Sequence, residues 1–336
     1  MTVAQPPAVR DGCPKRMVFG PCGGVRDDGR CELADHPCVF LDLVHPPPVE
    51  PVTGVGLADV PLVLTDLSVP PTEPRMLIRT AERLRGSADA LLVGDHQDRP
   101  DFAPTVLARL IAEAGARPWV TLACRERSRA ALELQLEGLQ ADGLATVVCV
   151  TGDGWRPEVR PTAPAVFDLD GTRLAGLAAA RGLTVAVPEA PAAPPVGLRP
   201  ERLVRKQQAG ASVAVLNHVA RPAQVASFLT AARALGLRLP VVASVAVYTD
   251  ETSARALAAL PGLELDAEAV TGVLAASDPV EAGIRTAVAQ AQALLAVDGV
   301  AGVNLSGLAS ARSTAFAADV QAEIGTRVRA QPVAVG

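Results

Sequence analysis

Cysteine is the residue type whose spacing is most suggestive of chemistry in this 336-residue chain. Cys124 and Cys149 stand apart, each inside an apolar run. The remaining four cysteines fall in one short N-terminal stretch: Cys13, Cys22, Cys31 and Cys38. The N-terminal residues show no secretory signal, so we expect a reducing compartment, where disulfides are rare. Clustered thiolates in such a protein more often bind a metal.

The residues around the four cysteines favour a metal site. They are rich in glycine and proline, which lets the backbone turn tightly enough for the sulfurs to converge. So short a piece cannot build a core of its own, and a bound metal would stabilise it. Zinc suits a closed structural site with four ligands, an iron–sulfur cluster needs the same four thiolates, and His36 could replace one cysteine. We therefore predict zinc or iron–sulfur in a module spanning residues 1–45.

A second group of polar side chains follows the ends of apolar runs later in the chain. If these runs are parallel strands of a barrel, their carboxyl ends meet at one mouth, where barrel enzymes hold their active sites. Asp168 and Asp170 are better interpreted as helix-start residues than as catalysts. The polar residues at the ends of the runs are Asp66, Ser68, Asp95, His96, Gln97, Thr121, Arg125, Arg127, Thr151, Gly152, Asp153, Glu189, Asn217, His218, Asn304 and Ser306.

The elements that would position these residues can be read from the apolar pattern. Strand-like runs without polar alternation indicate strands buried on both faces, and hence a parallel sheet. The runs are Pro61–Leu67, Ala90–Gly94, Trp119–Cys124, Thr146–Thr151, Leu183–Val187, Ser212–Leu216, Pro240–Val245 and Val300–Leu305. Helical patterns lie between them, most with proline where a helix begins. They include Pro74–Leu84, Pro104–Ala114, Arg127–Leu139, Pro200–Gln208 and Pro222–Leu235.

Eight such strand–helix units predict a (β/α)₈ TIM barrel over residues 59–328, preceded by a proline-rich linker at 46–58. A doubly wound open sheet is the alternative. Against it, Leu67–Pro71 stands where the glycine-rich dinucleotide fingerprint would lie. The stretch Ala246–Ala276 is expected to add helical turns without changing the strand count.

Composition narrows the class of protein. Apolar residues make up 49% of the chain and charged residues 20%, which supports a sizeable core and excludes a disordered protein. A net charge of −5 and an aromatic content of 3% argue against a nucleic-acid groove. No apolar run is long enough for a membrane span. We therefore expect a soluble, cytoplasmic protein that binds neither nucleic acid nor membrane.

The N-terminal sequence Cys13-Pro-Lys-Arg-Met-Val-Phe-Gly-Pro-Cys22-Gly-Gly-Val-Arg-Asp-Asp-Gly-Arg-Cys31-Glu closely resembles the cysteine-rich module associated with bacterial methylenetetrahydrofolate reductases. The stretch from Pro61 to Ser306 resembles the reductase barrel itself. Its landmarks are Asp89–Gln97, Thr121–Arg129, Val148–Asp153, Val166–Asp170, Arg205–Ala211 and Gly302–Leu305.

The resemblance implies a flavoprotein in which reduced FAD passes hydride to 5,10-methylenetetrahydrofolate, giving the 5-methyl form. NAD(P)H would be a possible donor, and an electron-donor protein or a second copy of the chain a possible partner. Asp66 and Asp153 would be catalytic, with Asp153 stabilising the cationic iminium form of the substrate. The residues implied to bind folate are Asn217, Gln97, Asp95 and Asn304. Those implied to contact FAD are Thr121, Thr151, Gly152, Asp168 and Lys206, with Lys206 on the phosphates.

This sequence departs from the family pattern at several of these positions. Asp66 replaces the catalytic glutamate, Asn217 replaces a glutamine, and Thr151 replaces an arginine. The loop Pro188–Pro195 lacks the family's histidine. Two alternatives to the reductase therefore stay open. One is a folate enzyme, with or without flavin, that transfers a one-carbon unit to another acceptor. The other is a non-catalytic folate-binding or electron-transfer subunit.

Overall fold

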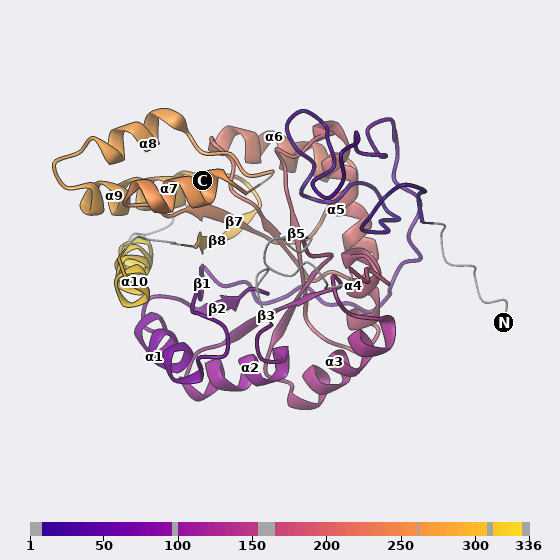
Figure 1. The fold of residues 1–336 in the computed structure, drawn as a ribbon, viewed down its shortest axis with the longest axis horizontal. Coiled ribbons are helices and arrows are strands. Elements are labelled where there is room, and N and C mark those ends of the chain that lie inside the picture. The colour runs from indigo at the N-terminus through magenta and orange to yellow at the C-terminus, as the bar shows by residue number, and fades with distance from the viewer. Residues whose placement is uncertain (1–8, 96–99, 154–164, 261, 308–311, 331–336) are drawn as a thin grey trace.

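Eight short apolar segments form a closed barrel of parallel strands in the computed structural model (Figure 1), which describes residues 9–95, 100–153, 165–260, 262–307 and 312–330. The strands are β1 (Val63–Asp66), β2 (Ala90–Val93), β3 (Pro118–Ala123), β4 (Thr146–Val150), β5 (Val185–Glu189), β6 (Val213–Leu216), β7 (Val241–Ala246) and β8 (Val300–Ser306). Each pairs with its sequence neighbours, and β8 closes on β1 through pairs such as Leu64 with Asn304. The predicted TIM barrel is confirmed, and the open sheet is excluded.

Helices surround the barrel on its outer face (Figure 1). Those expected from the sequence are α1 (Pro74–Leu84), α2 (Pro104–Glu113), α3 (Arg129–Asp142), α5 (Arg199–Gln208) and α6 (Pro222–Ala234), and α5 follows the short 3₁₀ turn η1 (Val196–Leu198). The expected extra turns after β7 form α7 (Glu251–Ala258) and α8 (Ala267–Leu274). The outer layer also contains α4 (Gly171–Ala179), α9 (Pro279–Leu295) and α10 (Thr314–Ala330). Within the described residues, no helix is both long and apolar enough to span a membrane.

Apolar side chains of the strands divide between two cores. The larger core lies between strands and helices and is built mainly from Val, Leu and Ala. A smaller core fills the barrel interior, where Leu64, Val148 and Val242 pack around the fully buried Trp119. Burial on both strand faces explains why the runs lack polar alternation.

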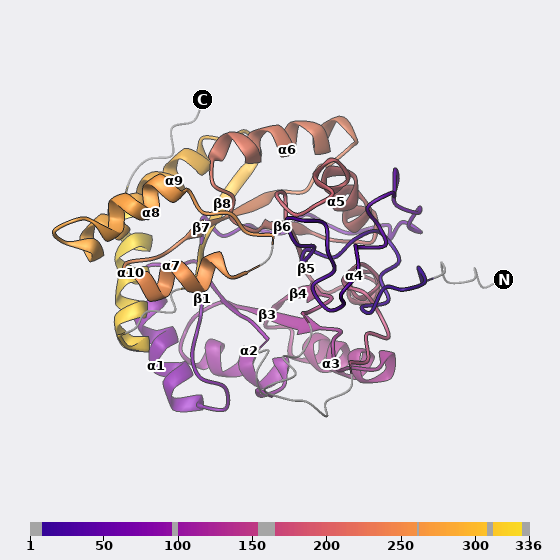
Figure 2. The ribbon, with the colours of Figure 1, turned by 45° about the horizontal axis from the view of Figure 1, so that its top comes forward.

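The cysteine-rich segment packs against the barrel beside α4 and α5 (Figure 2). Residues 9–45 form neither helix nor strand apart from an isolated bridge between Arg30 and Pro37. Met17 and Phe19 are buried, and the Val18 amide donates to Asp170 Oδ2 at 3.0 Å. Met17 Sδ also lies 3.5 Å from Thr151 Oγ1, just beyond β4, so the segment is buried in part against the barrel. Residue types and spacing indicated a piece without a core of its own and gave no sign of this contact with the barrel.

The proline-rich residues 46–58 lead from this segment to β1. The Val52 amide donates to Gln208 O at the end of α5, at 2.9 Å, and the Ala58 amide donates to Ser212 O just before β6, at 3.2 Å. The stretch is thus fixed to the barrel through its backbone at two places.

Candidate functional site

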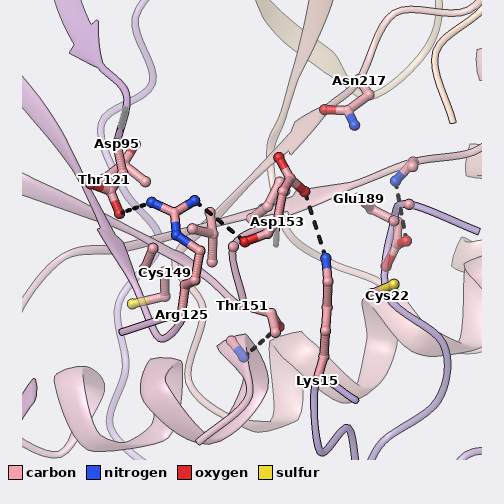
Figure 3. Close-up of a pocket in the computed structure, with 18 of the residues that line it drawn as sticks. Lys15, Cys22, Asp95, Thr121, Arg125, Cys149, Thr151, Asp153, Glu189 and Asn217 are labelled. Atoms are coloured by element: carbon pink, nitrogen blue, oxygen red, sulfur yellow. Dashed lines mark hydrogen bonds and ion pairs between the residues drawn. The ribbon is translucent and has the colours of Figure 1, made fainter. Parts of the chain in front are cut away.

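A cavity of about 380 Å³ lies at the carboxyl ends of the strands (Figure 3). It has two sources of lining residues, because the cysteine-rich segment covers part of the barrel mouth. The segment contributes Lys15, Cys22, Gly23 and Gly24. The barrel's polar contribution includes Asp95, Thr121, Arg125, Thr151, Gly152, Asp153, Glu189, Arg202, Lys206, Asn217 and Ser306.

Lys15 connects the segment to the barrel electrostatically. Its ammonium forms an ion pair with Glu32 of the same segment and lies 3.6 Å from Asp153 Oδ1, just beyond β4 (Figure 3). The Cys22 thiol donates to Glu32 Oε1 at 3.2 Å. Burial alone would lower the pKa of Lys15, but the neighbouring acidic groups Cys22, Glu32 and Asp153 outweigh it and raise that pKa. Burial raises the pKa of the Cys22 thiol to about 12.

A buried carboxylate surrounded by cations forms the wall at the end of β5. Glu189 lies 2.8 Å from Lys206 Nζ, 3.3 Å from Arg202 Nε and 3.4 Å from Arg199 Nη1. Burial would raise the pKa of Glu189, but the three cations lower it to about 2. Burial, opposed by Glu189 and reinforced by the neighbouring arginines, lowers the pKa of Lys206 to about 8. Three cations and one carboxylate leave this wall with excess positive charge.

A second charged network lies at the ends of β2 and β3. Asp95 Oδ2 lies 3.4 Å from Arg125 Nη2 and 3.3 Å from Arg127 Nη1. The Arg125 side chain is buried, and its Nη1 donates to the backbone oxygen of Asp153 at 3.4 Å. Gly152 has φ +86°, and a Cβ there would lie 3.2 Å from the Cβ atoms of Ala123 and Arg125. Glycine therefore allows the chain after β4 to pass close to β3.

Two residues expected to contact flavin are engaged at helix starts. Thr151 Oγ1 accepts from the Gly171 amide at 2.9 Å, at the beginning of α4. Asp168 Oδ2 accepts from the Arg129 amide at 2.8 Å, at the beginning of α3, and Asp168 does not line the cavity. Asp170 caps α4 by accepting from the Arg173 amide at 2.9 Å. The helix-start interpretation of Asp168 and Asp170 is confirmed.

Asp66 and Asn304 come together, but neither lines the cavity. Asp66 accepts from Asn304 Nδ2 at one carboxylate oxygen and from the Gly307 amide at the other, both at 3.0 Å. Burial raises the pKa of Asp66, opposed by hydrogen bonds from Gly307, Asn304 and Ser306. This arrangement holds β8 beside β1.

The cavity gathers most of the residues expected at the site. The predicted residues that line it are Asp95, Thr121, Arg125, Thr151, Gly152, Asp153, Glu189, Lys206, Asn217 and Ser306, together with Cys22. Gln97 and His96 lie outside the described residues. Lys15 and Arg202 also line the cavity, and neither was expected there from the sequence. Lys15 sits inside the cysteine motif, yet no sequence signal indicated that this motif covers the barrel mouth.

The four N-terminal cysteines surround a second, much smaller cavity of about 20 Å³, which His36 also lines. Cys22 lines both cavities and so lies in the wall between them. Within the described part of the chain, no group of three or more His, Cys, Asp or Glu side chains is arranged to hold a metal ion. The zinc or iron–sulfur site therefore stays a prediction.

Comparison with known proteins matches the N-terminal segment to a family. Residues 8–46 match the family described as methylene-tetrahydrofolate reductase C terminal. No curated protein matches the chain. The match confirms the resemblance seen in the cysteine-rich sequence, and a closed eight-stranded barrel is the fold that this resemblance implies for the rest of the chain.

Solved structures resemble the chain in fold. A Clostridium thermocellum protein, described as an uncharacterized protein that binds two copies of 5-methyl-5,6,7,8-tetrahydrofolic acid, aligns with a TM-score of 0.57 at 11% identity. The alignment covers 81% of this chain and 96% of that one. Tryptophan synthase from M. tuberculosis aligns with a TM-score of 0.45 at 14% identity, covering 82% and 93%. At these identities the likeness concerns the fold alone.

Proposed function

We propose that the barrel cavity binds a reduced folate and that the chain acts as a methylenetetrahydrofolate reductase-like enzyme, converting 5,10-methylenetetrahydrofolate to the 5-methyl form. One observation supports this most directly. The segment that matches the reductase-associated family also forms a wall of the barrel cavity. The Clostridium thermocellum protein of similar fold, described as binding 5-methyltetrahydrofolate, supports the same class of ligand.

The proposed roles follow from the chemistry of the lining residues. Asp153, beyond β4, provides a carboxylate that would stabilise the cationic iminium form of the substrate. Its side chain is about half exposed to the cavity, so a ligand can reach it. Asn217, beyond β6, offers an amide that can both donate to and accept from a pterin. The fixed position of both residues at strand ends would limit the reorganisation needed on binding.

The wall around Glu189 fits a phosphate-bearing cofactor such as FAD. Its excess positive charge suits an anion, and Arg202 Nη1 is buried without a hydrogen-bond partner among the described residues. Arg202 and Lys206 would hold the phosphates, and Thr121 and Gly152 would face the ring system. When bound, FAD would supply the hydride. Thr151 and Asp168 fit this role less well, because both already bond to helix amides.

An anaerobic assay tests the reductase proposal. Purified full-length protein with FAD and a chemical reductant should convert 5,10-methylenetetrahydrofolate to 5-methyltetrahydrofolate. Asp153→Asn should lower kcat more than it weakens folate binding, because the charge acts mainly on the cationic species. Asp142→Asn, at the end of α3, removes a carboxylate paired with Arg109 and serves as the control. Turnover of Asp153→Asn equal to that of wild type would contradict the role given to Asp153.

A second candidate is folate-dependent transfer of a one-carbon unit to another acceptor. Asp66, which the family resemblance implies to be catalytic in a reductase, favours this candidate because it does not line the cavity and instead bonds to Asn304 and Gly307. If the reductase is correct, Asp66→Asn should abolish methyl formation and Asp66→Glu should raise it. If neither wild type nor Asp66→Glu reduces the substrate with any donor while folate still binds, transfer to another acceptor is the better account.

A further inference from the structure

Lysine is rare in this chain, and both lysines lie at the same cavity. Of the 31 Lys and Arg residues, only Lys15 and Lys206 are lysines. Lys15 comes from the cysteine-rich segment and Lys206 from α5, and both are at least nine-tenths buried. An ammonium is a compact charge with three donors, whereas a guanidinium is a broad, planar fork. Both lysines therefore place a compact cation at the ligand cavity.

The contacts of Lys15 leave it able to bind a ligand. Glu32 accepts one of its hydrogen bonds, and Asp153 Oδ1 lies 3.6 Å away as a second negative partner. An ammonium has three N–H donors, so these two partners leave one for an acceptor in the cavity that Lys15 lines. Figure 3 shows the Lys15 side chain extending toward Asp153 from the segment's side of the cavity.

The segment is held in a fixed position against the barrel, which gives Lys15 a defined place. A Cβ on Gly262 would lie 2.3 Å from Gly23 O, so the barrel backbone passes close to the segment there. Arg199 Nη1 also donates to Pro21 O at 3.4 Å. These two contacts flank Cys22 and hold this part of the segment against the barrel.

We propose that the cysteine-rich segment completes the ligand site of the barrel and that Lys15 is its binding residue. Lys15 holds the Asp153 carboxylate and donates its remaining N–H to an acceptor oxygen of the bound folate. This inference rests on the proposed function for the identity of the ligand. It assigns the segment a direct part in binding, independent of any metal.

The test measures the affinity of the full-length protein for 5-methyltetrahydrofolate by isothermal titration calorimetry. Lys15→Met should weaken binding about tenfold to a hundredfold, as expected for loss of a charge-assisted hydrogen bond. Lys15→Arg keeps the charge and should recover part of the affinity. Arg16→Met removes a neighbouring exposed cation and should bind like wild type.

Lys15→Met alone leaves Glu32 buried without its ion-pair partner and could prevent folding of the segment. The double variant Lys15→Met/Glu32→Gln removes both buried charges and should fold, as judged by circular dichroism, while still binding folate at least tenfold more weakly.

The outcomes separate this inference from the proposed function. If wild type binds folate and the folded double variant binds equally well, the role of Lys15 is wrong while folate binding stands. If Lys15→Arg binds folate no better than the double variant, the cation at this position does not contact the ligand. If wild type binds no folate, the proposed function fails, and the inference that rests on it falls with it.

Discussion

Replacing Glu189 with glutamine is expected to destabilise the barrel more than any surface charge substitution. Glu189 is 2% exposed at the end of β5 and balances Arg199, Arg202 and Lys206. Glutamine has a similar shape but no charge. The change would leave three buried cations without their shared counter-ion, and breaking a buried ion pair in this way typically costs about 3–5 kcal/mol.

The lowered pKa of Glu189 gives a second value for the free energy that its ion pairs contribute to stability. Its fall from 4.5 to about 2 corresponds to roughly 3 kcal/mol, because one pKa unit is worth about 1.4 kcal/mol. Because the folded-state pKa is the lower one, this stabilisation is fully present above the unfolded-state pKa of about 4.5. It is lost as the pH falls from there toward 2. The difference between wild type and Glu189→Gln should therefore be about 3 kcal/mol at pH 7 and should shrink below pH 4.5.

Urea unfolding followed by circular dichroism at pH 7 and at pH 3 measures both quantities. Glu137→Gln removes an exposed carboxylate paired with Arg181 at 3.2 Å and serves as the matched control. It should change the free energy of unfolding by less than about 1 kcal/mol. A Glu189→Gln variant as stable as this control at pH 7, or one whose deficit does not diminish at pH 3, would refute the account of this wall.

Three further predictions concern the segment and the cavity. Gly262→Ala should loosen the segment, because its Cβ would meet Gly23 O at 2.3 Å. Gly236 has a similar positive φ but no atom near its Cβ position, so Gly236→Ala should lower the melting temperature less than Gly262→Ala. Thermal melting of both variants measures the difference. Gly152→Ala should reduce folate affinity, because φ is +86° and its Cβ would press on Ala123 and Arg125 at 3.2 Å; an unchanged dissociation constant would contradict this. Wild-type protein purified without chelator should contain zinc or iron by elemental analysis. Cys22→Ala should release this metal while the barrel stays folded. A metal-free wild type would show that the cysteines serve another purpose.

The barrel could be predicted from the sequence because the apolar runs and the prolines at helix starts indicate the same elements that the structure contains. Each strand run is apolar throughout, as burial on both faces requires, and the expected Pro74–Leu84 coincides with α1 because proline fixes where the helix begins. Asp170 was likewise recognisable as a helix-start residue, and it caps α4. These features depend on residues close together in the chain.

The arrangement of the site depended on contacts that sequence spacing does not encode. Asp66 ends β1, yet its carboxylate bonds to Asn304 and Gly307 across the β1–β8 junction and does not line the cavity. The cysteine motif indicated a small independent module, whereas its apolar side chains pack on the barrel and bring Lys15 to Asp153. Which strand-end residues face a ligand is decided by such long-range packing.

Titration of the purified full-length protein with 5-methyltetrahydrofolate in a calorimeter shows whether this composite cavity binds a reduced folate. We expect saturable binding that weakens at least tenfold in Asn217→Ala, because the amide is proposed to bond to the pterin. Thr230→Ala, an exposed position on α6, should bind like wild type. Absence of binding by folded wild-type protein, or binding unaffected by Asn217→Ala, would contradict the account.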